Sequence, residues 1–237
     1  MDLKEIDVFG GDIGKHWYYW AKAKAVSKWL GNTQPKAILD VGAGSGFFSS
    51  YLLERSSAQE AWCVDINYEA DSDTTHSGKP LHFRKSVEQV DADLVLFMDV
   101  LEHVEDDAGL LMEYAAKVPK GAKILVSVPA FRFLWSGHDV FLGHYRRYTL
   151  KEVQSVLKKA GLSLIDGGYF YGFVFPIAAS IRTMQNIFSK GSEPKSQMQK
   201  HSPLVNSVLK SMCAAELSVM RYNKFAGLTV FCLAEKV

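Results

Sequence analysis

The chain has 237 residues, with 27 Lys and Arg against 26 Asp and Glu, which gives a formal net charge of +1. Mixed charge of this kind argues against a dedicated nucleic-acid-binding protein, which usually carries a basic face. The composition is that of an ordinary globular protein, and the length suits one α/β domain with an added segment.

The cysteines and the longest apolar stretches indicate the compartment. Cys63, Cys213 and Cys232 are an odd number without metal-ligand spacing, so we expect reduced thiols in a cytoplasmic protein and no metal site. Residues 1–12, MDLKEIDVFGGD, contain no apolar core of signal-peptide length. No window reaches the ~20 apolar residues of a membrane span, so we expect no transmembrane segment.

The first predicted element is an aromatic-rich helix over residues 16–30, HWYYWAKAKAVSKWL. Gly31-Asn32 and Pro35 then indicate the end of the helix and a loop. Four large aromatic side chains in succession cannot all face inward on one helix. We therefore expect one or two of them to face a ligand or a partner.

Residues 37–54, AILDVGAGSGFFSSYLLE, predict a strand, a glycine turn and a helix. The apolar run at residues 37–39 has the character of a buried strand. Apolar residues recur at helical spacing after the glycines. A strand, a turn and a helix in this order form the nucleotide-binding corner of a doubly wound α/β sheet.

Strands and helices then alternate along the chain. Further strands are predicted at 61–64, 81–83, 93–98, 122–128, 162–165 and 228–234, helices at 106–118 and 149–160, and a polar loop at 69–80. Thr149 and Glu152 have the spacing of a capping box, and Gly161 is expected to end that helix. The alternation implies parallel pairing with right-handed crossovers. We expect an α/β fold with a doubly wound, mostly parallel sheet.

Residues 169–226 break this alternation. The pattern predicts an apolar helix over 169–188, a polar linker over 189–203 and a second helix over 204–222. The interpretation is a core of residues 1–168 and 227–237 with a helical insertion of residues 169–226. The insertion is compatible with a lid, a dimer contact or a peripheral membrane surface, and a lid is favoured because such caps exclude water from an active site.

The residues around the glycine turn select its ligand. A dinucleotide fingerprint has glycines at the first, third and sixth positions, but the sixth position counted from Gly42 is Phe47. The Asp40 carboxylate would repel a pyrophosphate, whereas it favours the cationic sulfonium and ammonium of S-adenosylmethionine. Asp65, at the end of the second strand, can accept hydrogen bonds from the ribose hydroxyls of either ligand.

The stretch ILDVGAGSG, the acid Asp65 and the segment LVLFMDVLEHVEDD (94–107) resemble class I S-adenosylmethionine-dependent methyltransferases. Within that class, they resemble the small-molecule enzymes related to the ubiquinone pathway. Residues 16–24 and 128–153 resemble motifs of members with unassigned substrates. The resemblance covers residues 36–165. It implies a Rossmann-like methyltransferase fold, S-adenosyl-L-methionine as cofactor, S-adenosyl-L-homocysteine as product, and methyl transfer by in-line displacement to a small-molecule or lipid-linked acceptor.

The resemblance also implies a set of cofactor contacts. The residues are Asp40, Gly42, Gly44, Gly46, Asp65, Ile66, Ser86, Met98, Asp99 and Lys22. Asp65 is expected to hold the ribose, and Ile66 to contact the adenine face. Lys22 stands where the motif often has an arginine that meets the cofactor carboxylate, but lysine is a point charge rather than a bidentate fork. Ser86 stands where many relatives have an acid for the adenine amino group.

Candidates for the chemistry lie after the fourth and fifth strands. His103, His138 and His144 are candidates for a general base, which helps if the acceptor is a hydroxyl. The candidates for acceptor binding are Trp135, Asp139, Tyr145, Arg146 and Arg147, since loops at the carboxyl edge of such a sheet bind ligands. The arginines could grip a phosphate or carboxylate. Alternatively, they pair with acids such as Asp139 or Glu152 and fix the loop, which the histidines could also brace.

Two other functions remain open at this point. An NAD-dependent oxidoreductase is disfavoured by Phe47 and Asp40. A non-catalytic cofactor-binding protein would keep the glycine turn without an acceptor site, and the histidines and arginines of residues 138–147 speak weakly against it. No nucleic-acid partner is expected, and both peripheral membrane contact and oligomer formation are compatible with the insertion.

Overall fold

The computed structural model describes residues 13–188 and 202–237. One eight-stranded sheet forms its centre, with strand order β3-β4-β2-β1-β5-β6-β8-β7. The strands are β1 (Ala37–Val41), β2 (Glu60–Val64), β3 (Ser72–His76), β4 (Lys79–Arg84), β5 (Leu94–Met98), β6 (Lys123–Pro129), β7 (Leu162–Phe170) and β8 (Thr229–Lys236).

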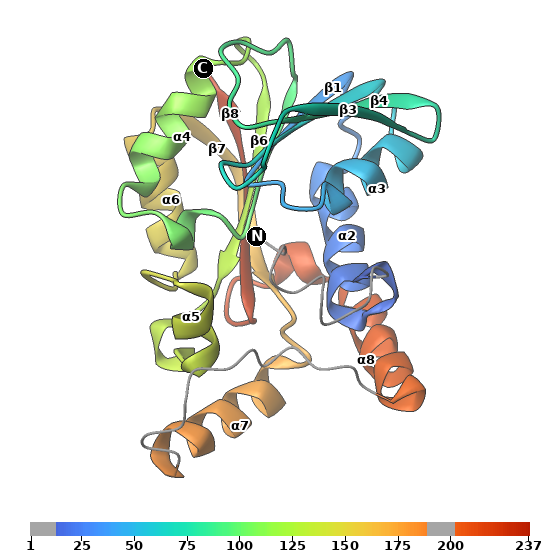
Figure 1. The fold of residues 1–237 in the computed structure, drawn as a ribbon. Helices are drawn as coiled ribbons and strands as arrows, with labels where there is room; N and C mark the ends of the chain where they lie inside the picture. The colour runs from blue at the N-terminus through green and yellow to red at the C-terminus, as the bar shows by residue number, and fades with distance from the viewer. Residues whose placement is uncertain (1–12, 189–201) are drawn as a thin grey trace.

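Helices cover both faces of the sheet (Figure 1). The helices are α2 (Trp17–Leu30), α3 (Phe47–Arg55), α4 (Asp107–Ala116), α5 (Gly137–Leu142), α6 (Leu150–Lys159), α7 (Phe175–Phe188) and α8 (Pro203–Glu216). Short 3-10 turns are η1 (Ile13–Lys15), η2 (Leu101–His103), η3 (Arg132–Leu134) and η4 (Met220–Tyr222). The prediction of an α/β, doubly wound and mostly parallel sheet is confirmed.

The pairing of the strands places the ends of several strands at one edge. β4, β2, β1, β5 and β6 pair in parallel, whereas β3 is antiparallel to β4, and β8 runs antiparallel between β6 and β7. The chain builds the sheet outward from β1 through β2 to the β3–β4 pair, and then continues with β5 on the other side of β1. The strand order therefore changes direction between β1 and β5. In open α/β sheets, ligands bind outside the carboxyl ends of the strands at such a switch point.

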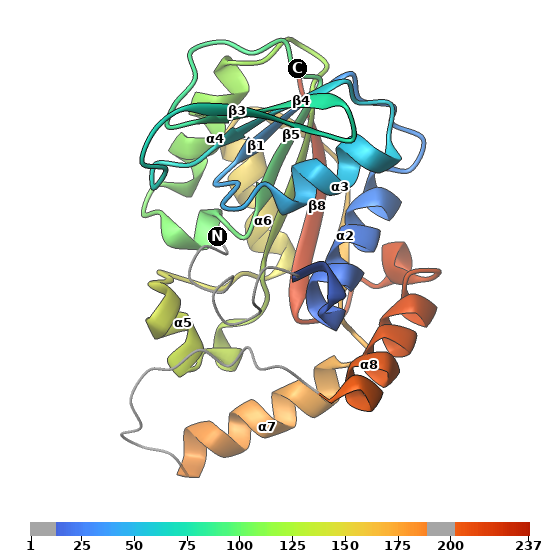
Figure 2. The same cartoon turned by 45° about the vertical axis from the view of Figure 1, so that its right-hand side comes forward.

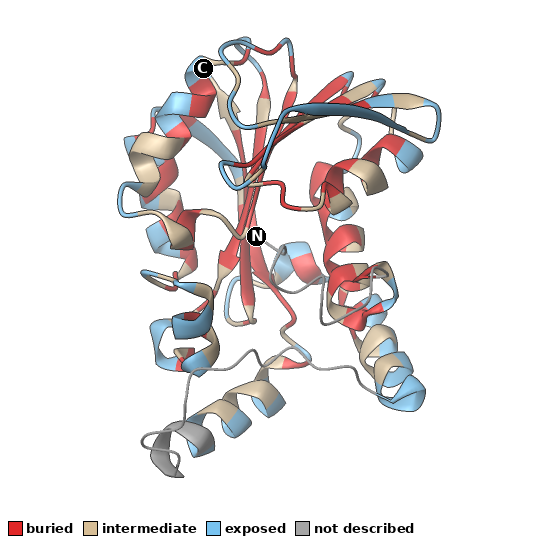
Figure 3. Cartoon of the chain, viewed as in Figure 1, coloured by how far each residue is buried: buried red, intermediate tan, exposed pale blue. Residues whose placement is uncertain are grey.

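The core has two layers, one on each face of the sheet. In Figures 1 and 2, α2, α3 and α8 lie on one side and α4 and α6 on the other, with α7 beyond the carboxyl edge. On the first side, Trp29 stacks on Phe231 with ring centroids 6.1 Å apart; on the second, Phe97 packs edge-on against Tyr114. The central strands are buried on both faces (Figure 3), as expected for a covered parallel sheet.

The prediction of a polar loop over residues 69–80 was wrong. These residues contain β3 and the start of β4, which form an antiparallel hairpin. Ser77 and Gly78 make its turn with left-handed φ values of 53° and 76°. Every residue of β3 except His76 is exposed, so this edge strand shows no alternation of apolar and polar residues that a sequence pattern could reveal.

The predicted helix over residues 169–188 begins later than expected. Tyr169 and Phe170 belong to β7, and α7 begins only at Phe175. The aromatic residues of this segment are compatible with either element, because β-strands favour aromatic side chains. Tyr171, with φ at 63°, turns the chain after the strand.

The capping box at the start of α6 is confirmed. The Thr149 side chain accepts a hydrogen bond from the Glu152 backbone N–H, and the Glu152 carboxylate accepts one from the Thr149 N–H at 2.6 Å. Gly161 follows the helix with φ at 73°. These contacts set the direction in which the chain leaves the loop after β6.

Several contacts join the described part of the insertion to the core. Asn206, on α8, accepts a hydrogen bond from the Trp17 N–H at 2.8 Å and donates one to the Lys15 carbonyl. Arg221 donates to the Trp29 carbonyl at 2.6 Å, and the Lys224 ammonium donates to the Asp166 carboxylate at 2.8 Å. The predicted polar linker lies largely outside the described residues, and the division into core and insertion stays a prediction.

Among the residues that the structure describes, no helix has the length and apolar character needed to cross a membrane. Cys63, Cys213 and Cys232 are buried free thiols. The cytoplasmic location stays a prediction.

Candidate functional site

The glycine turn lies at the switch point between β1 and β5. Gly42, Gly44 and Gly46 all have left-handed φ values, from 54° to 71°. A Cβ atom at Gly42 would lie 2.7 Å from a Val100 methyl group, so no larger residue fits there. The turn is held to β2 by the Gly42 N–H, which donates to the Val64 carbonyl at 2.7 Å.

Asp65 closes the other side of this turn. It is buried at the end of β2, where Oδ2 accepts a hydrogen bond from the Gly44 N–H and Oδ1 accepts one from the Asn67 N–H. The Asn67 side-chain amide donates to Oδ1 as well, at 2.9 Å. The next residue, Ile66, is 81% exposed. An acid for hydroxyls beside an open apolar side chain fits a nucleoside.

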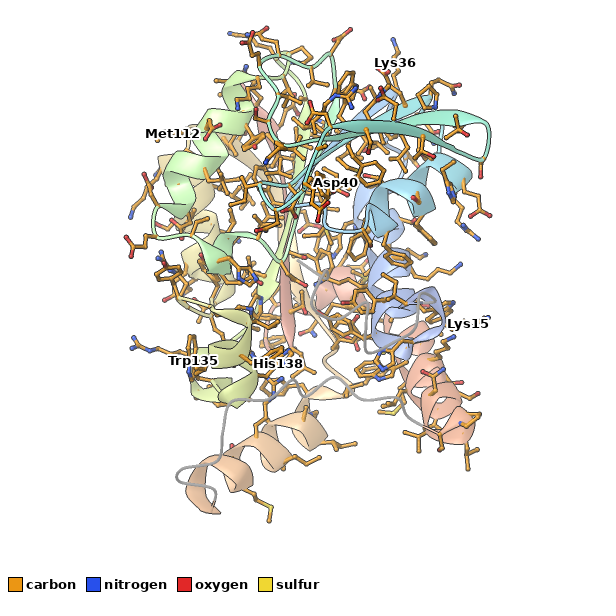
Figure 4. All side chains as sticks on the ribbon, in the orientation of Figure 1. Lys15, Lys36, Asp40, Met112, Trp135 and His138 are labelled. Carbon is orange, nitrogen blue, oxygen red and sulfur yellow. The ribbon has the colours of Figure 1, made fainter. Side chains whose placement is uncertain are left out.

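The remaining predicted cofactor residues differ in their exposure. Asp40 is buried in β1, where its carboxylate accepts a hydrogen bond from the Ser49 hydroxyl at 2.8 Å. Met98 is buried at the end of β5. Ser86 is exposed, two residues beyond the end of β4. Asp40 and Met98 thus lie at adjacent strand ends, and Figure 4 shows Asp40 near the middle of the molecule.

Lys22 and Asp99 form a buried ion pair across the edge of the sheet. Asp99 follows β5 with a left-handed φ of 55°, and its carboxylate contacts the Lys22 ammonium. Tyr18 and Ser127 donate hydroxyl hydrogen bonds to the same carboxylate. Burial by itself lowers the pKa of Lys22, but the charges and hydrogen bonds of Asp99 and Tyr18 together outweigh burial and raise that pKa above its usual value. Lys22 is therefore positively charged at the position where it was expected to meet the cofactor carboxylate.

The aromatic residues at the start of α2 differ in burial. Trp17 and Tyr19 are buried, whereas Tyr18 is only half-buried. The Tyr18 ring stacks on Tyr171 with centroids 5.2 Å apart, and the Tyr171 hydroxyl donates to the Tyr18 carbonyl at 2.6 Å. This contact joins α2 to the end of β7 and aims the Tyr18 hydroxyl at the Lys22–Asp99 pair.

Asp139 organises the segment that follows β6. Its carboxylate is fully buried and accepts hydrogen bonds from two Arg147 nitrogens at 2.7 and 3.1 Å and from the Ser136 N–H at 2.8 Å. The His144 Nδ1 atom lies 2.9 Å from the same group. Burial works to raise the pKa of Asp139, but His144 and Arg147 outweigh it and hold the pKa well below its usual range. This favours the interpretation in which Asp139 and Arg147 brace the loop.

Arg146 points to a different place from Arg147. Its guanidinium donates to the Asp107 carboxylate at 3.3 Å and to the Glu105 carbonyl at 2.8 Å. Arg146, Arg147, Trp135 and Tyr145 line a surface groove of about 640 Å³ against α6. Of the predicted acceptor residues, only Asp139 does not line this groove, and Arg147 both borders the groove and braces Asp139.

The three candidate histidines are divided as well. The His103 and His144 rings meet edge-to-face with centroids 4.6 Å apart, whereas His138 lies on α5 beside Trp135, above α7 in Figure 4. Burial, with the positive charge of Arg182, lowers the pKa of His138 to about 4. His138 is therefore neutral near pH 7.

Sequence reasoning missed two charged residues next to these histidines. Glu102 is fully buried beside His103. Arg182, on α7, donates to the Leu134 carbonyl at 3.4 Å and carries a pKa lowered to about 10, chiefly by burial. The pair Glu102-His103 was visible in the sequence, but nothing there placed residue 182 beside residue 134.

The fold, the glycine turn and the acid at the end of β2 define a class I S-adenosylmethionine-dependent methyltransferase. The sequence profile of the family described as a methyltransferase domain matches residues 15–166. That range is more than half of the chain, which therefore belongs to this family. The predicted class, enzyme activity and cofactor are confirmed. No curated protein matches the chain.

Solved structures share the fold at low identity. A Haloferax volcanii protein described as a methyltransferase, in complex with the Trm112 methyltransferase activator, has a TM-score of 0.58 at 15% identity, over 99% of this chain and 95% of that one. A Galdieria sulphuraria protein described as a sarcosine dimethylglycine methyltransferase has a TM-score of 0.57 at 14% identity, over 99% and 97%.

A third structure contains two bound small molecules. Haemonchus contortus phosphoethanolamine N-methyltransferase 2, with phosphomonomethylethanolamine and S-adenosylhomocysteine, has a TM-score of 0.55 at 16% identity. The alignment covers 92% of this chain but only 53% of that chain.

Replacing Lys22 by Met is predicted to lower the free energy of unfolding by about 3 kcal/mol, because it leaves the Asp99 carboxylate without its cation. The double variant Lys22→Met, Asp99→Asn should recover most of this loss, since no unpaired charge remains. Urea unfolding of both variants and of Asp99→Asn measures the coupling. Additive losses in the double variant would contradict a coupled pair.

The neutral state of His138 predicts a pH dependence of stability. The unfolded chain has a histidine pKa near ~6.5, above the folded value of about 4. Between these values the unfolded state binds the extra proton, so the free energy of unfolding falls as pH is lowered from about 6.5 to about 4. His138→Gln should flatten this decline in urea unfolding at stepped pH. A decline as steep as in the wild-type protein would contradict the assignment.

Proposed function

We propose that this methyltransferase methylates a small-molecule acceptor that carries a phosphate or carboxylate group. The observation that carries the proposal is Arg182. It is a largely enclosed guanidinium that has no carboxylate partner among the described residues. A buried cation without a counterion is costly, so an anionic group on the acceptor would complete the site.

The neighbours of Arg182 leave a positive balance. Arg147 already neutralises Asp139 through two hydrogen bonds. Arg182 stands close enough to Arg147 for that charge to help lower the Arg182 pKa, and His138 is neutral. An acceptor anion at this place would meet a charge-assisted donor with open hydrogen-bonding capacity. The phosphomonomethylethanolamine in the Haemonchus contortus structure gives one precedent for a phosphate-bearing acceptor on this fold.

The residues around the glycine turn fit S-adenosylmethionine. Asp65 would accept hydrogen bonds from the ribose hydroxyls, and Ile66 would cover one face of the adenine. Asp40 lies where a carboxylate favours positive charge, and the charged Lys22 is placed for the carboxylate of the amino-acid part. The cofactor supplies an activated methyl group. The protein aligns the acceptor with it and excludes water.

We propose that α7 serves as the lid over this acceptor site. Its Arg182 reaches η3, and α7 lies across the carboxyl edge below α5 in Figures 1 and 2. The outer face of α7 exposes Ile177, Ile181 and Met184, each more than half exposed. These residues recur at helical spacing on one face. That apolar face supports a lipid-linked acceptor and peripheral membrane contact as the second candidate.

S-adenosylhomocysteine at ~100 times its dissociation constant is expected to add about 2.7 kcal/mol of stability. This raises the melting temperature by roughly 5–10 °C. Asp65→Ala should weaken binding by roughly 10-fold or more, because a charged hydrogen-bond acceptor is lost. Asp91→Ala, at an exposed position, is the matched control. A thermal shift with NAD but none with S-adenosylhomocysteine would contradict the cofactor assignment.

Arg182→Met is expected to raise KM for the acceptor by roughly 10-fold or more, through loss of a charge-assisted contact, while binding of S-adenosylhomocysteine stays unchanged. The assay follows methyl transfer to paired acceptors, each phosphate or carboxylate against its neutral ester. The control is Arg55→Met, at an exposed pair on α3. Equal turnover of charged and neutral members of each pair would exclude an anionic acceptor.

A further inference from the structure

Glu102 has an unusual environment for a carboxylate. It lies in η2, just after β5, with 0% exposure, and neither carboxylate oxygen has a hydrogen-bond partner among the described residues. An ionised carboxylate buried without a partner is strongly unfavourable. A cation beside Glu102 would supply the partner that the carboxylate lacks.

Two imidazole rings face the same point. One potential ligand atom from each of Glu102, His103 and His144 lies within 4.8 Å of the others. These residues come from η2 and from the start of the segment after α5. The two segments are joined by the Tyr145 N–H, which donates to the Glu102 carbonyl at 2.7 Å. A backbone hydrogen bond therefore holds the two segments together, in addition to the proximity of the side chains.

Asp139 orients one of the two rings. Because the His144 Nδ1 atom faces the Asp139 carboxylate at 2.9 Å, Nε2 is the nitrogen available for coordination. A carboxylate behind a histidine is the usual outer-shell arrangement of a metal-binding imidazole, where it fixes the tautomer and raises the basicity of the ligand. Arg147 and Ser136 hold Asp139 in turn, so the ring orientation is set before any ion arrives.

We propose that Glu102, His103 and His144 form a binding site for a divalent transition-metal ion of the Zn²⁺ type. Two imidazoles and one carboxylate are ligands that Zn²⁺ and its first-row neighbours accept. Metal–ligand distances of ~2.0–2.2 Å place tetrahedral ligand atoms about 3.5 Å apart. The three ligand atoms would therefore move about 1 Å closer to one another when the ion binds. The expectation of no metal site was drawn from the cysteines alone. None of the three residues proposed here is a cysteine.

Three protein ligands leave at least one coordination position open, as in catalytic zinc sites. If the acceptor is a hydroxyl, which rests on the proposed function, the ion would bind its oxygen and favour loss of its proton. Metal binding itself needs no acceptor and no methyl donor, so it can be tested separately from the proposed function.

Isothermal titration of the chelator-treated full chain with Zn²⁺ tests the site directly. We expect one Zn²⁺ per chain in the wild-type protein and at least ~10-fold weaker binding in Glu102→Gln and in His144→Ala. The matched control is His82→Ala, which removes a histidine that also faces acidic side chains, Asp73 and Glu60, but on the exposed hairpin. It should bind Zn²⁺ as the wild-type protein does. Binding that is absent, or equal in all four proteins, would overturn the proposal.

Thermal unfolding separates loss of the site from loss of the fold. Glu102→Gln keeps the side-chain shape and removes the buried charge, so without metal its melting temperature should equal or exceed that of the wild-type protein. Added Zn²⁺ should raise the melting temperature of the wild-type protein and leave that of Glu102→Gln unchanged. An equal Zn²⁺-induced shift in both proteins would contradict the assignment. Binding of S-adenosylhomocysteine to all variants reports the cofactor site independently.

Discussion

The ion pair between the buried Lys22 and the partly buried Asp99 is the interaction that joins α2 to the sheet. The lysine comes from the middle of α2 and the carboxylate from the residue after β5, so the pair connects segments 77 positions apart. A charge with no exposure to water is tolerated only when its partner is in place. The position of α2 is therefore coupled to the backbone conformation of Asp99, which has a left-handed φ of 55°. Tyr18, one turn before Lys22, adds its hydroxyl to the same carboxylate and its ring to Tyr171.

A second buried carboxylate has the same effect on the acceptor side. Asp139 gathers Arg147, His144 and Ser136, and so folds the segment between β6 and α6 onto itself. Each of the two acids lies near the carboxyl edge of the sheet, one after β5 and one after β6. Glu102 lies close enough to Asp99 for that charge to raise the Glu102 pKa, and Arg182 lies close enough to Asp139 for that charge to raise the Arg182 pKa. Each paired acid therefore lies near a charged residue that has no ion-pair partner among the described residues.

The fold was largely predictable from the sequence because its main signals are local. Apolar runs of strand length, the alternate glycines and the Thr149–Glu152 capping box each act within a few residues. The β3–β4 hairpin was missed because an exposed edge strand has no buried face and therefore no apolar period. The positions of the proposed cofactor residues were predictable for a related reason, since Gly42, Asp65 and Asp99 each follow a strand, and strand ends of a parallel sheet meet at one edge.

The acceptor side was harder to predict because it depends on contacts between distant segments. The sequence placed Arg146 and Arg147 side by side, yet their guanidinium groups point to Asp107 and Asp139, which differ in burial and in function. No local pattern distinguishes a bracing arginine from a binding one. The distinction follows from charge balance: a guanidinium already matched by a buried carboxylate has little left to offer an acceptor. By the same reasoning the groups without a matched partner, Arg182 and Glu102, are where an anion and a cation would each complete the site.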